Sequence, residues 1–126
     1  VKFNPLPQFL KGKRIVLVDD SIVRGTTTKK LTKMLKENGA KEVHLRIGSP
    51  PIRYSCYYGI DTPNREKLIA SKMEIEEVRK FIGADTLKYL SIEDLRKCVK
   101  EPSSYCYACF NGDYPAGEKK HPSLVS

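Results

Sequence analysis

The sequence lacks the features that mark membrane and secreted proteins. Within its 126 residues, no apolar run approaches the roughly 18 residues that cross a bilayer, so we expect no membrane insertion. Nothing near Val1 resembles a signal peptide, and we expect no secretion signal. Internal repeats and low-complexity tracts are also absent. With 40% hydrophobic and 30% charged residues, the composition is that of a globular domain.

Cysteine is scarce, and the thiols are unevenly spaced. The chain has four, at Cys56, Cys98, Cys106 and Cys109. They are too few and too irregular for a disulfide scaffold, and no secretion signal is expected. They therefore indicate a reducing compartment, which we take to be the cytoplasm. We expect the thiols to be free or bound to a metal.

Acidic residues are in the minority. Lys and Arg number 23 against 15 Asp and Glu, which gives a net charge of +8 and a pI near 9.4. This balance favours an anionic partner, and phosphorylated metabolites satisfy it as well as nucleic acid does. The basic residues are scattered over predicted helix faces, without a nucleic-acid-binding motif or stacking aromatics among them. We therefore expect a solvated surface and no nucleic-acid partner.

An α/β pattern occupies the first half of the chain. The apolar run within Arg14 to Val18 predicts a strand buried on both faces, as in a parallel sheet. A helical pattern follows, with Gly39 where a glycine is expected after a helix C-terminus. Alternating apolar residues from Glu42 to Ile47 predict a second strand, so these segments form one βαβ unit.

Three helix starts are expected in the second half, at Thr62, at Ser71 and at Ser91. Ser71 is followed three residues later by Glu74, which matches a capping box ahead of an apolar stripe that ends at Gly83. A third strand is expected near residues 86–90. Two or three strands are too few for a sheet covered on both faces. We therefore expect the later part of a larger α/β domain, with the other strands upstream.

Chemistry concentrates where the first predicted strand ends. Asp19 and Asp20 follow the apolar run, and a Gly-Thr-Thr turn leads into the next helix. In open α/β sheets, ligands bind at the carboxyl ends of strands. Two carboxylates there can hold Mg²⁺ or sugar hydroxyls, and the N–H groups of Arg24 to Thr27 at a helix N-terminus can hold a phosphate. The combination favours a ligand with both a diol and a phosphate.

The same residue pattern is compatible with a purely structural role or with a different chemistry. A pair of aspartates can merely end a strand, and threonines can merely cap a helix. A phospho-acceptor of the receiver type also ends a strand with two acids around Mg²⁺. Such a protein has no use for Arg24, Gly25 and two threonines in the same loop.

The run from Val16 to Thr27 resembles the phosphoribosylpyrophosphate (PRPP) signature of type I phosphoribosyltransferases. Further blocks resemble the glutamine PRPP amidotransferases: Lys2–Pro5, Gly12–Lys13, Gly39–Ala40, Ser49–Ile52, Tyr58–Asp61, Leu68–Ala70, Ile82–Leu87 and Cys106–Phe110. The resemblance implies part of a type I phosphoribosyltransferase fold, an α/β fold with a parallel sheet and flanking helices, over residues 1–101. An irregular cysteine-containing segment would follow over residues 102–126. The family's N-terminal glutaminase domain has no counterpart among these residues.

The resemblance also implies a function. The family transfers ammonia from glutamine to C1 of PRPP and yields 5-phosphoribosylamine, the first committed step of purine biosynthesis. Asp19 and Asp20 would hold the ribose and Mg²⁺. The 5′-phosphate loop would comprise Ser21, Arg24, Gly25, Thr26 and Thr27. These residues would position PRPP, and none would take a further catalytic part.

Purine nucleotides are implied as feedback inhibitors, and the parent enzyme is expected to be a homo-oligomer. Because the glutaminase domain and the upstream loops are missing, we expect the isolated chain to be inactive. A non-catalytic regulator that keeps a PRPP loop to sense nucleotide supply is the alternative.

Cys106-x-x-Cys109 has the spacing of metal ligands, with Cys56 as a candidate third, yet a lone C-x-x-C is as compatible with free thiols. Some members of the resembled family bind a [4Fe-4S] cluster. That likeness would make Cys56, Cys106 and Cys109 three of its four ligands, with the fourth before this chain begins. Cys98 shares an apolar stripe and is predicted to be core. Neither His44, which has no evident partner, nor His121 is a credible catalyst.

Overall fold

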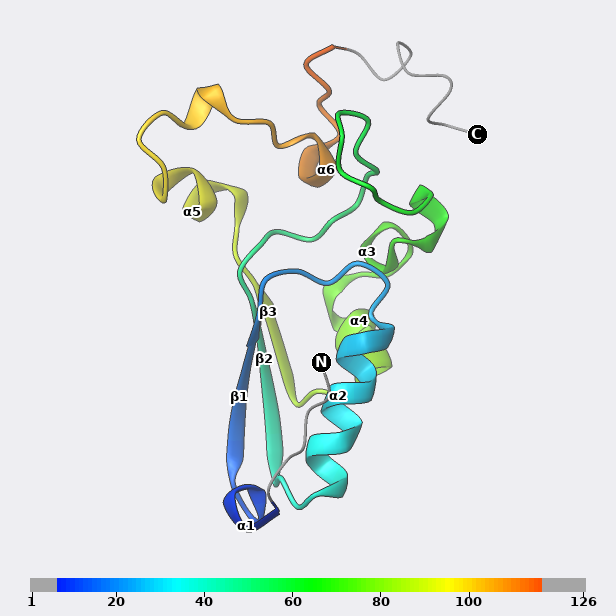
Figure 1. The fold of residues 1–126 in the computed structure, drawn as a ribbon, viewed down its shortest axis with the longest axis vertical. Coiled ribbons are helices and arrows are strands. Elements are labelled where there is room, and N and C mark those ends of the chain that lie inside the picture. Colours follow the sequence, from blue (N-terminus) through cyan, green and yellow to red (C-terminus); the bar gives the residue numbers. More distant parts are fainter. Residues whose placement is uncertain (1–6, 117–126) are drawn as a thin grey trace.

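The computed structural model describes residues 7–116, and its centre is a parallel sheet of three strands (Figure 1). The strands are β1 (Arg14–Asp19), β2 (Glu42–Ile47) and β3 (Thr86–Tyr89), in the order β1-β2-β3. All three strands that the sequence predicts are therefore confirmed. The register pairs Asp19 with Ile47 and Ile47 with Tyr89, so the carboxyl ends of the strands lie at one edge. The block Lys2–Pro5 and His121 lie outside the described residues.

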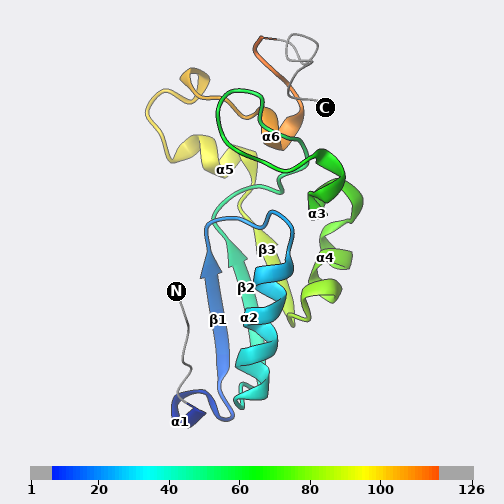
Figure 2. The same cartoon turned by 45° about the vertical axis from the view of Figure 1, so that its right-hand side comes forward.

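Two helices pack on one face of the sheet. These are α2 (Thr26–Glu37) and α4 (Ile75–Ile82), which lie side by side against the strands (Figures 1 and 2). The other helices are short: α1 (Pro7–Leu10), α3 (Ile69–Lys72), α5 (Ile92–Lys97) and α6 (Ala108–Asn111), with 3₁₀ turns at Arg65–Lys67 and Pro102–Ser104. Helices α5 and α6 lie beyond the carboxyl ends of the strands. None of the described helices is long and apolar enough to cross a membrane.

The core lies between the sheet and these two helices. Alternate residues of β2 are buried: Leu45 and Ile47 cluster with Val78 and Ile82 of α4, and Val43 clusters with Leu35 of α2. The main cluster of buried residues is Ile22, Leu45, Ile47, Ile69, Val78, Ile82, Ala84 and Leu87. Because burial of each Leu, Ile or Val contributes about 1.5–3 kcal/mol, this cluster holds α4 and the loop containing Ile22 against the sheet.

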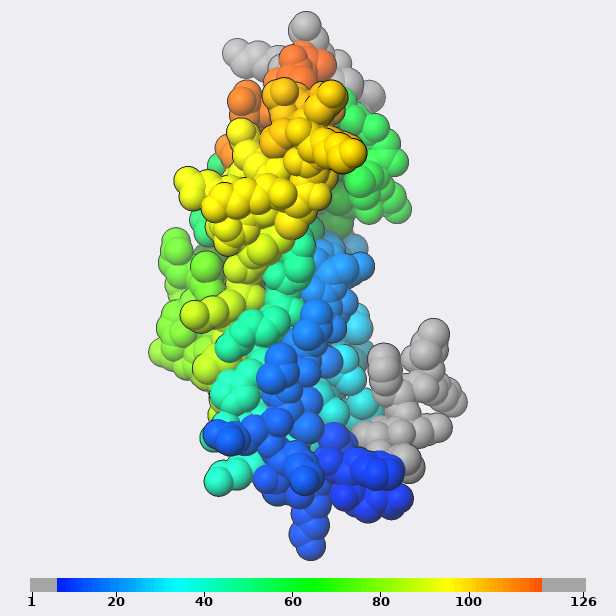
Figure 3. Space-filling view, turned by 90° about the vertical axis from the view of Figure 1, so that its left-hand side faces the viewer, coloured from blue at the N-terminus to red at the C-terminus, as the bar shows by residue number. Residues whose placement is uncertain are grey.

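The prediction that β1 is buried on both faces is wrong. Ile15 and Leu17 pack against the core, whereas Val16 is 63% and Val18 73% exposed. The side chains of the three strands form the molecular surface on this side (Figure 3). β1 is an edge strand, and no helix among residues 7–116 covers its second face. The sheet therefore has one covered and one open face, as expected for part of a larger α/β domain.

Two of the three predicted helix starts differ from the structure. The segment after Thr62 has no α-helix before α3. Ser71 lies inside α3, where its hydroxyl donates to the Leu68 carbonyl at 2.7 Å, so it caps nothing downstream. The capping box is formed by Glu74 and Glu77, and α4 begins at Ile75.

The end of α4 and the start of α5 are confirmed. Gly83 follows α4 with a φ of +85°, in the left-handed region that favours glycine. The Ser91 hydroxyl accepts a hydrogen bond from the Asp94 N–H at the start of α5. The local cap signals therefore place both helix ends.

The structure corrects two further expectations. Cys98 is exposed, because α5 buries none of its residues against the sheet, and its Sγ donates to the Asp94 carbonyl at 3.3 Å. His44 does have partners on the open face of the sheet. Its Nε2 lies 2.8 Å from Glu42 Oε2, and its Nδ1 lies 2.8 Å from Thr86 Oγ1.

Asp85 links the strand layer to α2 and makes stability depend on pH. Its Oδ2 accepts a hydrogen bond from the Val43 N–H at 2.8 Å and lies 3.2 Å from Lys36 Nζ. The Val43 N–H first, and then Lys36, lower the pKa of Asp85 below its ordinary value of 3.8. A carboxyl with a lowered folded-state pKa stabilises the fold above its unfolded pKa, and this contribution is lost as the pH falls through the folded pKa.

We predict that Asp85→Asn lowers the free energy of unfolding at pH 7 and that the difference from wild type shrinks as the pH falls below about 4. Denaturant unfolding between pH 7 and pH 3.5 measures it. Glu37→Gln is the control, because Glu37 belongs to an exposed pair with Lys33 that contributes little. A difference that grows on acidification would contradict the assignment.

Candidate functional site

The predicted phosphate loop crosses the carboxyl edge of the sheet, between β1 and α2 (Figure 1). β1 ends at Asp19, whose carbonyl accepts a hydrogen bond from the Gly48 N–H at 2.9 Å. This bond ties the end of β1 to the residue that follows β2. The strand end that carries the first aspartate is therefore fixed by the sheet.

A pocket of about 290 Å³ opens at this loop. Its lining residues are Asp19, Ser21, Val23, Arg24, Gly25, Thr26, Thr27 and Thr28. The structure thus brings together every residue predicted for the site except Asp20. Asp20 is exposed beside the pocket, and its carboxylate accepts a hydrogen bond from Ser21 Oγ at 3.3 Å.

The N-terminus of α2 supplies donors for an anion. Gly25 is its N-cap, no side chain makes a capping hydrogen bond, and the first turn contains no acidic residue. The first N–H groups of a helix have no partner within the helix, and they carry the positive end of its dipole. The pocket wall at Gly25 to Thr28 is therefore suited to a phosphate.

Gly25 is required by its surroundings. Its φ is +80°, and a Cβ built there would lie 2.9 Å from Ile69 Cδ1 and 3.4 Å from Phe81 Cε1. A side chain at this position would be strained by the backbone and would also collide with α3. The loop backbone consequently packs directly on side chains of α3 and α4.

Sequence reasoning missed the residues that support this loop. Ile22 is 1% exposed within the main core cluster, and the Ile69 N–H donates to the Val23 carbonyl at 3.0 Å. The apolar pair Ile22-Val23 inside an otherwise polar loop is a local signal for the first contact. No local signal connects Ile69 or Phe81 to a loop more than forty residues earlier.

The two aspartates offer hard oxygen ligands at the pocket. Asp19 Oδ1 accepts a hydrogen bond from the Asp20 N–H at 2.8 Å, and Asp19 is half-buried. Among the described residues, no group of three or more His, Cys, Asp or Glu is arranged to hold a metal ion. Mg²⁺ commonly uses one or two carboxylates together with waters and substrate oxygens, and this pair fits that pattern.

Three of the four thiols lie near one another beyond the sheet. Burial first, and then the neighbouring Cys56 and Cys106, raise the pKa of Cys109 to about 11. The Cys109 carbonyl accepts hydrogen bonds from the N–H groups of Arg53 and Tyr54, which fasten α6 to the segment that carries Cys56. The three thiols fit an iron-sulfur cluster in ligand type, although they are not arranged as a metal site.

Comparison with known proteins gives one consistent result. The chain is 56% identical over 116 residues to amidophosphoribosyltransferase 1, chloroplastic, of Arabidopsis thaliana, and 52% identical over 116 residues to the amidophosphoribosyltransferase of Methanothermobacter thermautotrophicus. Each match covers 91% of this chain, but only 20% and 24% of the two relatives. No family model matches the chain.

A solved structure gives the same result for the fold. Glutamine PRPP amidotransferase from B. subtilis, complexed with ADP and GMP, matches with a TM-score of 0.78 and 52% sequence identity. The match covers 87% of this chain and 25% of that one. By both comparisons, the chain is a homologue of one segment of the amidophosphoribosyltransferases, about a fifth to a quarter of their length.

Proposed function

We propose that the chain is the PRPP-binding segment of a full-length amidophosphoribosyltransferase, which transfers ammonia from glutamine to C1 of PRPP and yields 5-phosphoribosylamine. One observation carries the proposal. Asp19 and the α2 N-terminus line a single pocket of about 290 Å³, so oxygen ligands and anion donors face one volume. Residues 1–101 would be the phosphoribosyltransferase portion, and residues 102–126 an irregular segment after it.

Each part of the pocket has a role in this proposal. Asp19 and Asp20 hold the ribose hydroxyls and the Mg²⁺ that accompanies PRPP. The backbone N–H groups from Arg24 to Thr27, with the Ser21 hydroxyl, hold the 5′-phosphate. Gly25 permits the close approach of the loop backbone to Ile69 and Phe81, because it has no side chain.

The proposed reaction depends on the positioning of PRPP more than on reactive side chains. Displacement of pyrophosphate at C1 passes through an oxocarbenium-like state, and Mg²⁺ supplies charge neutralisation to the leaving group. The residues of the pocket hold the ribose and the 5′-phosphate in place while the bond from C1 to pyrophosphate breaks and the bond from C1 to the ammonia nitrogen forms. Fixed orientation and fixed dipoles are effective catalytic devices in such a step.

The whole reaction needs more than this segment. The chain spans about a fifth to a quarter of the length of its relatives, and we propose that the glutaminase domain of the full-length enzyme lies outside these residues. We infer that the isolated chain has no turnover. The relatives are named as enzymes, which favours this proposal over a PRPP-sensing regulator.

We further propose that Cys56, Cys106 and Cys109 bind a [4Fe-4S] cluster in the full-length enzyme, with a fourth ligand outside this chain. The support is that the three thiols lie near one another, since both Cys56 and Cys106 raise the pKa of Cys109. Cys98 is exposed at the C-terminal end of α5, and it is not among the groups that shift the pKa of Cys109. It has no part in the cluster.

Regulation and location are further parts of this proposal. The B. subtilis structure is complexed with ADP and GMP, and we propose that purine nucleotides also bind and inhibit the full-length enzyme, as a homo-oligomer. The free thiols among the described residues suit a reducing compartment. We propose the cytoplasm, although relatives from Arabidopsis are named chloroplastic.

Replacement of both aspartates tests the ribose and Mg²⁺ assignment. In the full-length enzyme, Asp19→Asn with Asp20→Asn is expected to weaken Mg·PRPP binding about tenfold or more, because loss of a charged hydrogen-bond partner costs about 1.5–3 kcal/mol. Isothermal titration measures the affinity. Asp94→Asn, on exposed α5, is the control. Unchanged affinity in the double variant would refute the site.

Gly25→Ala tests the close approach at the loop. The variant is expected to lose about 1–2 kcal/mol of stability from its positive φ, and to bind Mg·PRPP more weakly because the new methyl group collides with Ile69. Gly12→Ala is a matched control, because Gly12 has a φ of +72° with nothing within 4 Å of the added Cβ. Thermal unfolding and titration separate the two effects. Equal PRPP affinity in both variants would contradict the assignment.

Cys109→Ser tests the cluster. Anaerobically prepared full-length enzyme is expected to contain near-stoichiometric iron and sulfide, and the variant is expected to lose both. Cys98→Ser should retain them. Iron and sulfide analysis, with the visible absorbance of the cluster, gives the result. Metal-free wild-type enzyme would overturn the proposal.

A further inference from the structure

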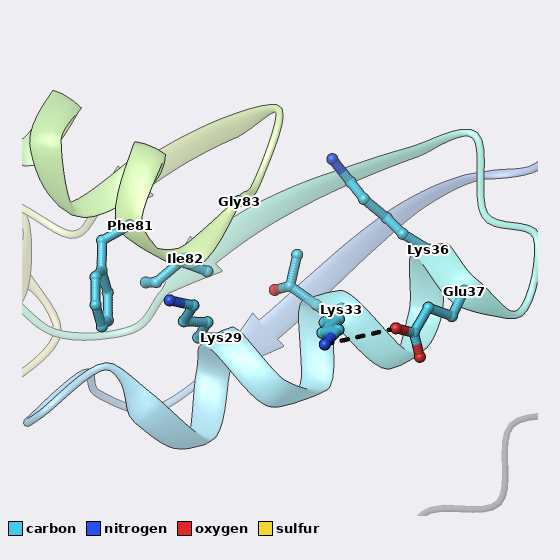
Figure 4. Close-up of a pocket in the computed structure, with 8 residues that line it drawn as sticks. Lys29, Lys33, Lys36, Glu37, Phe81, Ile82 and Gly83 are labelled. Carbon is cyan, nitrogen blue, oxygen red and sulfur yellow. Dashed lines mark ion pairs between the residues drawn. The ribbon is translucent and has the colours of Figure 1, made fainter.

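A groove of about 440 Å³ runs between α2 and α4 (Figure 4). Its lining residues are Lys29, Thr32, Lys33, Lys36, Glu37, Phe81, Ile82 and Gly83. Lys33 is paired with Glu37 along the groove at 3.8 Å. Lys29 lies instead over the ring of Phe81, with Nζ 4.4 Å from the ring centroid.

Phe81 also touches the phosphate loop. A Cβ built on Gly25 would lie 3.4 Å from Phe81 Cε1 and 3.6 Å from Cδ1, so the ring already fills the space behind the loop backbone. The Lys29 N–H donates to the Gly25 carbonyl at 2.9 Å, as part of the first turn of α2. The ring of Phe81 therefore lies against the loop on one side. Lys29 of α2, the helix that follows the loop, covers it.

We propose that Phe81 is a positioning residue for the phosphate loop: with Ile69, it fixes the backbone of Gly25 so that the N–H groups at the start of α2 face the pocket. The inference rests on the proposed function, in which this loop binds the 5′-phosphate of PRPP. Phe81 does not line the loop pocket, so it acts through Gly25 and not on the substrate.

The physical need for such support is clear from the loop itself. Its anion donors are backbone N–H groups, and their direction is set only by the backbone. Donors that are already oriented bind better, because less conformational freedom is lost on binding. Two ring atoms of Phe81, Cε1 and Cδ1, border the Cβ position of Gly25, and the shorter side chain of leucine would leave space there into which the loop can relax.

The contact is separable from the stability of α4. Val78 and Ile82, at 1% and 3% exposure, anchor the helix in the core, whereas Phe81 is only half-buried. Phe81 also packs against the edge of this core cluster, so Phe81→Leu keeps an apolar residue there, on an anchored helix, and removes the ring that lies behind Gly25. Ile75, on the same helix and 39% exposed, offers a control position away from the core.

The test uses the full-length enzyme with Phe81→Leu, Phe81→Tyr, Lys29→Gln and Ile75→Ala. Phe81→Leu is expected to raise the Kd and the KM for PRPP about tenfold while the KM for glutamine and the melting temperature stay close to wild type. Phe81→Tyr, which keeps the ring, should retain wild-type affinity, and so should Ile75→Ala. Lys29→Gln should give a smaller increase in the same direction, and it tests the contact even if Phe81→Leu does not fold.

The outcomes separate the two levels of the proposal. If the wild-type enzyme does not bind Mg·PRPP, the proposed function itself is wrong. Wild-type enzyme that binds, together with a folded Phe81→Leu variant of equal affinity, would overturn the positioning role alone. A Phe81→Tyr variant as weak as Phe81→Leu, or an equal rise in the KM for glutamine, would also overturn it.

Discussion

The burial of Ile22 is the constraint on which the rest of the site depends. A polar loop of this kind would ordinarily lie free on the surface, but Ile22 is drawn into the cluster formed by the strands, α3 and α4. Together with the hydrogen bond from the Ile69 N–H to the Val23 carbonyl, this anchor fixes the path of the chain between the end of β1 and the start of α2. Asp19 and the helix N-terminus then face the same pocket because the path between them is short and fixed.

The same hydrophobic cluster explains why the fold is one-sided. Its members come from β2, β3, α3, α4 and the adjoining loops, whereas the opposite face of the sheet presents Val16 and Val18 beside a hydrogen-bonded row of polar residues on β2 and β3. An α/β sheet is normally covered on both faces. A homologue of about a quarter of a longer enzyme, with one face open, is consistent with that rule.

The strands and the loop are predictable from the sequence, because their signals are local. An apolar run and an alternating segment identify β1 and β2, and the aspartates with Gly25 identify the pocket. Ser71 misleads because Ser71 and Glu74 have the spacing of a capping box, whereas the box in the structure is formed by Glu74 and Glu77. Cys98 misleads because a helical stripe cannot reveal whether another element packs on it. The support from Phe81 is not predictable, since it depends on a tertiary contact.

The two walls of the pocket are held by different kinds of contact. The wall at Asp19 belongs to a strand whose end is bonded to the neighbouring strand through Gly48. The opposite wall, at Gly25, is supported from behind by Ile69 and Phe81. A small change of volume behind Gly25 would therefore move that wall alone. A change at the carboxylate end would disturb the sheet itself.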